Sequence, residues 1–164
     1  MLFKVTSKMN NSAAFLPLTR HQEERKKRIM TVDDEADVVF SLSEFLQETG
    51  LFEVDGFTDP LRALSSFRPG KYDLVILDIR MPGMDGFELY GKIKQLDKNV
   101  DICFLTAVSN FSEYQQVYPD ITDEIEKDKD SCVIDKPADT EQLMKKIDKV
   151  MGRRIRKQSK AAEA

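Results

Sequence analysis

The chain has 164 residues, with 29 acidic and 25 basic side chains and a formal net charge of −4. This length is typical of one domain with short extensions. The sequence has no apolar stretch of the roughly 20 residues that a membrane-spanning helix needs, and residues 1–18 lack the compact apolar block of a signal peptide. We therefore expect a cytoplasmic protein that does not bind membranes.

The charge is distributed unevenly along the chain. Residues 29–151 carry 26 acidic and 13 basic side chains, a net −13, whereas residues 1–28 carry a net +5 and residues 152–164 a net +4. This pattern predicts a flexible basic N-terminal arm over 1–27, a folded domain over 28–151 and a basic C-terminal tail. The basic ends could contact nucleic-acid phosphates, but the body is acidic and has no DNA-reading helix motif, so we expect disordered, solvated ends instead.

Beyond residue 28, predicted strands and helices alternate. The strands are short apolar runs, and the helices carry apolar residues three or four positions apart. Asp59-Pro60 and Asp139 are typical helix starts, and Pro69-Gly70 is a typical helix end. The predicted strands are 29–32, 52–57, 72–77, 102–105 and 132–134, and the predicted helices are 35–49, 60–67, 87–96, 110–118 and 140–150.

This alternation predicts right-handed βαβ units and a parallel sheet with helices on both faces. Acidic residues end both the first and the third strand, which favours neighbouring positions for those two strands. The expected fold is therefore α/β, a doubly wound (βα)5 three-layer sandwich with parallel sheet order 2-1-3-4-5.

Four of the predicted strands end in a polar or charged side chain. Asp33 and Asp34 follow the first strand, Asp78 the third, Thr106 the fourth and Lys136 the fifth. The carboxyl ends of parallel strands share one edge, where ligand sites form. Three clustered carboxylates repel one another, and a divalent cation removes that repulsion. One of them could merely cap the next helix, but all three together favour a Mg²⁺ site.

The same residues suggest phosphoryl chemistry. Asp78 follows the strongest apolar strand, so its carboxylate is a rigidly presented nucleophile that can form an aspartyl phosphate. Phosphoryl transfer needs positioning and charge neutralisation above all. Mg²⁺ and the ammonium of Lys136 can supply that neutralisation, and the hydroxyl of Thr106 can donate a hydrogen bond to a phosphoryl oxygen.

These motifs together resemble the receiver domain of two-component response regulators. The resemblance covers about residues 28–151 and implies a flavodoxin-like fold. The motifs that carry it are Asp33-Asp34, Asp78-Ile79-Arg80-Met81-Pro82-Gly83-Met84-Asp85-Gly86, Thr106-Ala107 and Lys136-Pro137.

The resemblance assigns roles to these residues. Asp78 would be the phosphoacceptor, with Lys136 in contact with the phosphoryl group. Asp34, Asp78 and the backbone carbonyl of Arg80 would bind Mg²⁺ directly, and Asp33 would bind it through water. The Lys136-Pro137 peptide bond would be cis, which is a minority state for such bonds.

Partners and mechanism also follow from the resemblance. A sensor histidine kinase would donate the phosphoryl group from its own phosphohistidine, and the one histidine of this chain, His21, lies outside the predicted domain. Phosphorylation would shift a conformational equilibrium through Thr106 and so change the binding of a downstream protein target. We expect a monomer or a phosphorylation-dependent dimer, and a signalling domain rather than an enzyme, with slow self-dephosphorylation.

The chain departs from the family pattern in the position three residues before the lysine. That position usually holds Tyr or Phe as a rotameric switch, and here it is Val133. The aromatic partner of the threonine is therefore absent, or it comes from Phe111, Tyr114 or Tyr118.

Two further departures concern the loop after the phosphoacceptor and the segment before the last strand. Arg80 stands two residues after Asp78, where its charge and bulk can alter the access of water. The segment from Thr106 to Lys136 is longer than usual, and we expect a short helix over 110–118 and a solvated loop over the charged run 120–130.

Other functions remain open. A phosphorylation-independent module with the same fold would be favoured by the loss of site residues, and none of the five is lost. A phosphatase of the related aspartyl-phosphate superfamilies normally carries a second Asp where this chain has Arg80. Cys103 and Cys132 lie in apolar runs without metal spacing, so we expect them to be buried and reduced; a disulfide is the alternative if the last two strands are neighbours.

Overall fold

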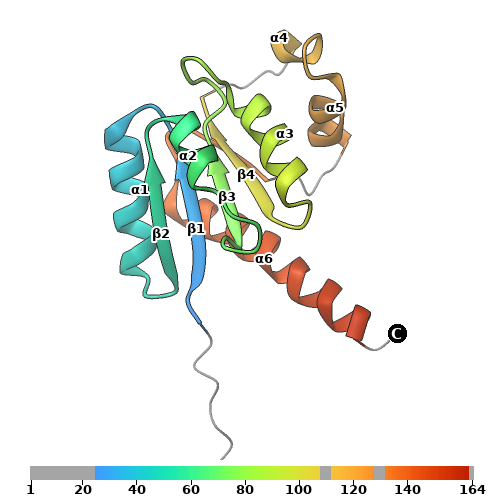
Figure 1. The fold of residues 1–164 in the computed structure, drawn as a ribbon. Coiled ribbons are helices and arrows are strands. Elements are labelled where there is room, and N and C mark those ends of the chain that lie inside the picture. The colour runs from blue at the N-terminus through green and yellow to red at the C-terminus, as the bar shows by residue number, and fades with distance from the viewer. Residues whose placement is uncertain (1–24, 108–111, 128–131, 163–164) are drawn as a thin grey trace, which may run out of the picture.

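A computed structural model describes residues 25–107, 112–127 and 132–162, so most of the predicted N-terminal arm lies outside the described residues. Five parallel strands form one sheet in the order β2-β1-β3-β4-β5 (Figure 1). The predicted sheet order is thereby confirmed. The strands are β1 (Lys27–Val32), β2 (Phe52–Phe57), β3 (Leu74–Leu77), β4 (Asp101–Thr106) and β5 (Val133–Asp135).

Helices cover both faces of this sheet, which gives the predicted three layers (Figure 1). The side chains of α1 and α6 belong to one buried cluster, and those of α2 and α3 belong to the other. The partly buried residues of α5 pack against the α2–α3 cluster. The helices are α1 (Ala36–Glu48), α2 (Pro60–Ser66), α3 (Gly86–Leu96), α4 (Ser112–Gln115), α5 (Pro119–Lys127) and α6 (Thr140–Ala162).

Strand β3 lies at the centre of the core, and all four of its residues are buried. Successive side chains of a strand point to opposite faces of the sheet. Val75 and Leu77 accordingly join one cluster, whereas Leu74 and Ile76 join the other. A continuous apolar run is what a parallel strand covered on both faces requires.

Residues 120–127, the described part of the segment predicted as a solvated loop over 120–130, are helical, so that prediction is wrong for them. Ile121 and Ile125 lie one helical turn apart in α5 and pack against the α2–α3 cluster. Thr122 is fully buried, and its hydroxyl donates to the carbonyl of Tyr118 at 3.0 Å. The apolar spacing therefore determines the structure of this segment, despite its high charge.

The last helix continues through Ala162, where the sequence predicts a disordered tail from residue 152. The expectation of disorder is therefore wrong for residues 152–162. The end of α6 projects beyond the sheet in Figure 1. Arg, Lys, Gln and Ala are strong helix formers, and they make up most of this segment.

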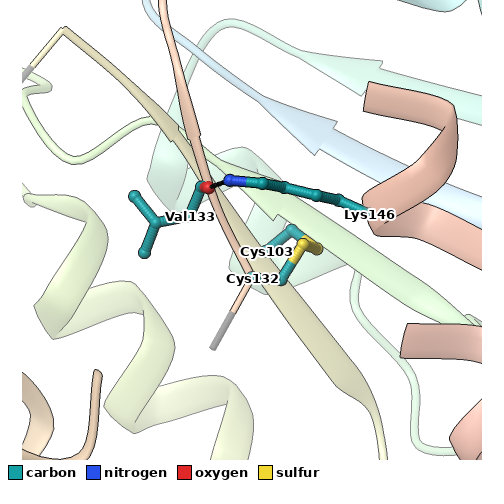
Figure 2. The surroundings of a disulfide bond; sticks show 4 residues. All are labelled: Cys103, Cys132, Val133 and Lys146. Atoms are coloured by element: carbon teal, nitrogen blue, oxygen red, sulfur yellow. Dashed lines mark hydrogen bonds between the residues drawn. A yellow bond between two sulfur atoms is a disulfide. The ribbon is translucent and has the colours of Figure 1, made fainter. Parts of the chain in front are cut away.

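The two cysteines are joined in a disulfide, so the expectation of reduced cysteines is wrong (Figure 2). Cys103 lies in β4 and Cys132 directly precedes β5, and both are buried. The register pairs Phe104 with Val133, which places the two preceding residues side by side with Cα atoms 4.5 Å apart. Lys146 of α6 donates a hydrogen bond to the carbonyl of Val133 beside this disulfide (Figure 2).

Candidate functional site

Three carboxylates meet at the carboxyl edge of the sheet. The register pairs Val32 of β1 with Leu77 of β3, and the N–H of Asp78 donates to the carbonyl of Val32 at 2.8 Å. One carboxylate oxygen from each of Asp33, Asp34 and Asp78 lies within 4.8 Å of the others. Asp33 and Asp78 are buried, whereas Asp34 is exposed.

Asp33 also shapes the start of the following helix. Its Oδ1 atom accepts the backbone N–H of Glu35 at 3.0 Å, and Glu35, at the N-cap position of α1, makes no side-chain cap of its own. The backbone N–H of Asp33 donates to the carbonyl of Phe57, the last residue of β2, at 3.1 Å. These bonds leave the second oxygen of Asp33 for the interior of the site.

Lys136 brings a positive charge to two of the three carboxylates, Asp33 and Asp78, and to Glu35. Its Nζ atom lies 2.6 Å from Asp33 Oδ2, 3.2 Å from Asp78 Oδ1 and 3.2 Å from Glu35 Oε1. The side chain is only 15% exposed. The Lys136–Pro137 bond is cis, as the resemblance implies.

The electrostatics of the site follow from burial and from these neighbours. Burial is the largest cause of a raised pKa at Asp78, to which the charge of Asp33 adds, while Lys136 acts in the opposite direction. Burial lowers the pKa of Lys136, but its hydrogen bond to Asp33 and the charge of Asp78 outweigh burial and raise that pKa to about 12. One ammonium therefore faces three carboxylates, and this excess of negative charge fits a divalent cation with oxygen ligands.

Thr106 completes the strand ends that the sequence singles out. It is the last residue of β4 and is buried. Its carbonyl accepts the backbone N–H of Lys136 at 2.9 Å, so the two residues are linked at the same edge of the sheet. The structure thus brings together all five of the predicted strand-end residues.

The loop after Asp78 is anchored at several points. Ile79, Met81 and Met84 are buried. The N–H of Gly86 donates to the carbonyl of Ile79 at 2.8 Å, and a Cβ atom on Gly86 would lie only 2.2 Å from the carbonyl oxygen of Asp78. The start of α3 therefore packs directly on the backbone that presents Asp78, which only glycine permits.

The side chain of Arg80 reaches α4. Its guanidinium forms an exposed ion pair with Glu113 of α4. The predicted role of the Arg80 carbonyl as a metal ligand stays a prediction.

Tyr114 and Tyr118 are two of the three aromatic residues that the sequence offers as a substitute partner of Thr106, and both pack on α3. The rings of Tyr114 and Tyr118 lie 5.1 Å and 5.6 Å from the ring of Phe87. The hydroxyl of Tyr118 donates to Asp85 at 3.0 Å; burial, together with this hydrogen bond, raises the pKa of Tyr118 to about 12. Val133 packs against the same cluster, and Phe111 lies outside the described residues.

Sequence reasoning misses two acidic residues around the site. Glu35 contacts Lys136, and its position directly after Asp33-Asp34 in the sequence could have indicated this contact. Glu113 contacts Arg80 across 33 residues of sequence, and no local pattern indicates that pairing.

Comparison with known proteins gives one family. The family model described as "Response regulator receiver domain" matches residues 29–148. Transcriptional regulatory protein PrrA of Mycobacterium tuberculosis is 36% identical over 86 residues, which are 52% of this chain and 36% of PrrA. Sporulation initiation phosphotransferase F of Bacillus subtilis is 30% identical over 90 residues, 55% of this chain and 72% of that protein. The match thus spans about a third of PrrA.

Solved structures agree with this assignment. The CheY-like receiver domain protein of Methanospirillum hungatei JF-1 has a TM-score of 0.67, covers 80% of this chain and 98% of its own, and at 23% identity shows the fold alone. Response regulator protein TrrA of Thermotoga maritima, solved in complex with Mg(2+)-BeF, is 36% identical with a TM-score of 0.61, covering 76% of this chain and 98% of its own.

Among the described residues, no helix is both long and apolar enough to cross a bilayer.

Proposed function

The chain belongs to the response regulator receiver domain family, and on this basis we propose that Asp78 accepts a phosphoryl group and that phosphorylation switches the binding of a partner protein. The observation that carries the proposal is the contact of Lys136 with both Asp33 and Asp78 at the edge of the sheet. This arrangement presents a nucleophilic carboxylate beside a fixed positive charge, as phosphoryl transfer requires.

The donor is the phosphohistidine of a sensor histidine kinase. An oxygen of Asp78 attacks the phosphorus atom, the new O–P bond forms, the N–P bond to the imidazole breaks, and the released imidazole nitrogen takes up a proton. Lys136 holds its ammonium against the phosphoryl oxygens during this exchange. Burial raises the pKa of Asp78, and the charges of Asp33 and Asp34 add to this effect, so neutralisation of those charges favours the ionised, attacking form.

A magnesium ion would be held by Asp34, Asp78 and the backbone carbonyl of Arg80, with Asp33 acting through water. The ion supplies charge neutralisation at the carboxylates and the phosphoryl oxygens when it is bound. The spacing of the carboxylate oxygens supports this assignment.

In this proposed function, residues 28–151 form a cytoplasmic receiver domain, which a basic arm precedes and a basic tail follows. The family match over 29–148 supports these bounds. The domain passes the signal to a downstream protein, as a monomer or as a phosphorylation-dependent dimer. The domain itself acts as a phosphoacceptor rather than as an enzyme with an external substrate.

A phosphorylation-independent interaction module is the second candidate. Val133 at the position of the usual aromatic switch favours it, because the common route from the phosphoryl group to the binding surface lacks one of its parts. In this case the fold and its surfaces would bind a partner constitutively.

Intact-mass analysis with a small acyl phosphate as donor distinguishes the two. We expect the wild-type protein to gain one phosphoryl mass in the presence of Mg²⁺, and to gain none with a chelator. Asp78→Asn should gain none under either condition. Asp97→Asn is the matched control, since Asp97 lies at the carboxyl end of α3 and accepts the backbone N–H of Gly70, which precedes β3, and it should behave as the wild type. The absence of any adduct on the wild type, even after rapid quenching, would establish the constitutive module instead.

A further inference from the structure

An ion pair joins the loop after Asp78 to the segment that follows β4. Arg80, two residues beyond Asp78, pairs with Glu113 in the short helix α4. Both side chains are largely exposed, at 63% and 51%. Their contact therefore joins the proposed phosphorylation site to α4 over the surface, and exposed pairs of this kind are weak.

The remaining attachments of this segment are apolar or neutral. Tyr114 and Tyr118 pack on Phe87, and the hydroxyl of Tyr118 donates to Asp85. These contacts lie on α3 and on its N-cap residue, Asp85, and Tyr114 also lies within hydrogen-bonding reach of Arg80. The Arg80 guanidinium is thus the group through which a new charge on Asp78 can act on α4 directly.

A phosphoryl group on Asp78 would compete with Glu113 for this guanidinium. It carries between one and two negative charges in place of the single charge of the carboxylate, with strong acceptor oxygens, and arginine binds phosphate oxygens in a bidentate, charge-assisted geometry. The Cα atoms of Asp78 and Arg80 are at most about 7 Å apart along the chain, a distance that an extended arginine side chain can span.

We propose that Arg80 exchanges partners on phosphorylation, binding Glu113 when Asp78 is unmodified and the phosphoryl group when it is modified. The exchange frees α4 from its ionic attachment and so carries the signal in a chain that has Val133 in place of the usual aromatic switch. This inference rests on the proposed function, because it needs a phosphoryl group on Asp78.

Competition for one cation makes a thermodynamic prediction. If Glu113 and the phosphoryl group bind the same guanidinium, removal of the Glu113 charge strengthens phosphoryl binding, and removal of Arg80 weakens it. By reciprocity, phosphoryl binding weakens the attachment of α4 by the same factor.

Calorimetric titration of the full chain with beryllofluoride in excess Mg²⁺ measures the first half of this prediction. Glu113→Gln should bind the phosphoryl analogue about two- to fivefold more tightly than wild type, and Arg80→Met should bind it more weakly, by about the same factor or more. The Arg80→Met variant keeps its backbone carbonyl. In the double variant the effect of Glu113→Gln should vanish, since no shared cation remains.

Glu53→Gln is the matched control, because it breaks another exposed Arg–Glu pair, with Arg28, on β1 and β2. Its affinity for beryllofluoride should equal that of the wild type. If Glu113→Gln leaves the affinity unchanged, or strengthens it equally in the Arg80→Met background, the partner exchange is refuted and any effect of Glu113 is a general charge effect.

Hydrogen exchange of residues 112–118, followed by mass spectrometry, measures the second half. Exchange in this segment should rise when beryllofluoride binds wild type, and it should already be raised in Glu113→Gln. Binding of the analogue with no change in exchange would overturn the inference and leave the proposed function intact. Failure of the analogue to bind, together with the absence of a phosphoryl adduct on wild type, would refute both.

Discussion

Replacement of Gly86 by alanine tests the packing that presents Asp78. A Cβ atom at residue 86 would lie 2.2 Å from the carbonyl oxygen of Asp78 and 2.9 Å from the Cα atom of Ile79. Ordinary van der Waals contact begins near 3.4 Å, so the two backbone segments must separate by about 1 Å. Overpacking in a buried region typically costs about 1–3 kcal/mol. Because backbone atoms cannot rotate away, we expect the upper end, about 3 kcal/mol of unfolding free energy.

Urea unfolding followed by circular dichroism measures this cost. With a slope of about 1.5 kcal/mol per molar urea, the midpoint of Gly86→Ala should fall by about 2 M. Gly91→Ala is the matched control, because it lies in the same helix and its Cβ atom would meet nothing within 4 Å. That variant should gain up to about 1 kcal/mol from the higher helix propensity of alanine. A wild-type midpoint for Gly86→Ala would refute the close packing of α3 on the backbone at Asp78.

Three other predictions concern ionisation, a hydrogen bond and the disulfide. Burial raises the pKa of Asp78, so the protonated form stabilises the folded protein, and that stability is lost as the pH rises through the raised value. Asp78→Asn should therefore melt several degrees above wild type at pH 7 in chelator, and the gain should shrink as the pH falls through the raised value toward the ordinary value of 3.8. A constant gain across this range would contradict the assignment. Tyr118→Phe removes the hydrogen bond to Asp85 and should lower the free energy of unfolding by about 1 kcal/mol. An absorbance titration of the tyrosines should then lose the component near pH 12, and a curve unchanged near pH 12 would place the raised pKa on another tyrosine. Reduction of the Cys103–Cys132 disulfide, whose cysteines are 29 residues apart, should lower the free energy of unfolding by about 3–4 kcal/mol. A thiol titration of the denatured, unreduced protein should find no free thiol. Two free thiols in protein purified without reductant would show that the cysteines are reduced, as is usual in a reducing cytoplasm.

The strand ends were the part of the molecule that sequence reasoning predicted best. Each strand is a short apolar run, and Asp33, Asp78, Thr106 and Lys136 stand where those runs stop. Parallel pairing then brings the four together without further information, because all carboxyl ends share one edge. The acidic residues after the first and third strands also predicted that these strands are neighbours, which fixed the sheet order.

The errors arose where composition was given more weight than spacing. The acidic run after Pro119 suggested a loop, although Ile121 and Ile125 lie one helical turn apart and pack inward in α5. The basic residues after 152 likewise suggested disorder, although the segment is rich in helix-forming residues and continues α6. High charge is compatible with a helix that has one buried stripe.

Two long-range side-chain contacts could not be decided from the sequence. The contact of Arg80 with Glu113 depends on where α4 lies relative to the loop after β3, and no sequence period encodes that position. The disulfide depends on the register of β4 and β5, in which a shift of one residue would separate Cys103 from Cys132.

The most direct test of the central claim is the position of the phosphoryl group. The protein is phosphorylated with a small acyl phosphate and Mg²⁺, reduced with borohydride so that an aspartyl phosphate becomes homoserine, digested and sequenced by mass spectrometry. We predict homoserine at position 78, in the peptide that spans β3 and the loop before α3. Homoserine at Asp33, Asp34 or another carboxylate, with Asp78 unmodified, would contradict this account of the site.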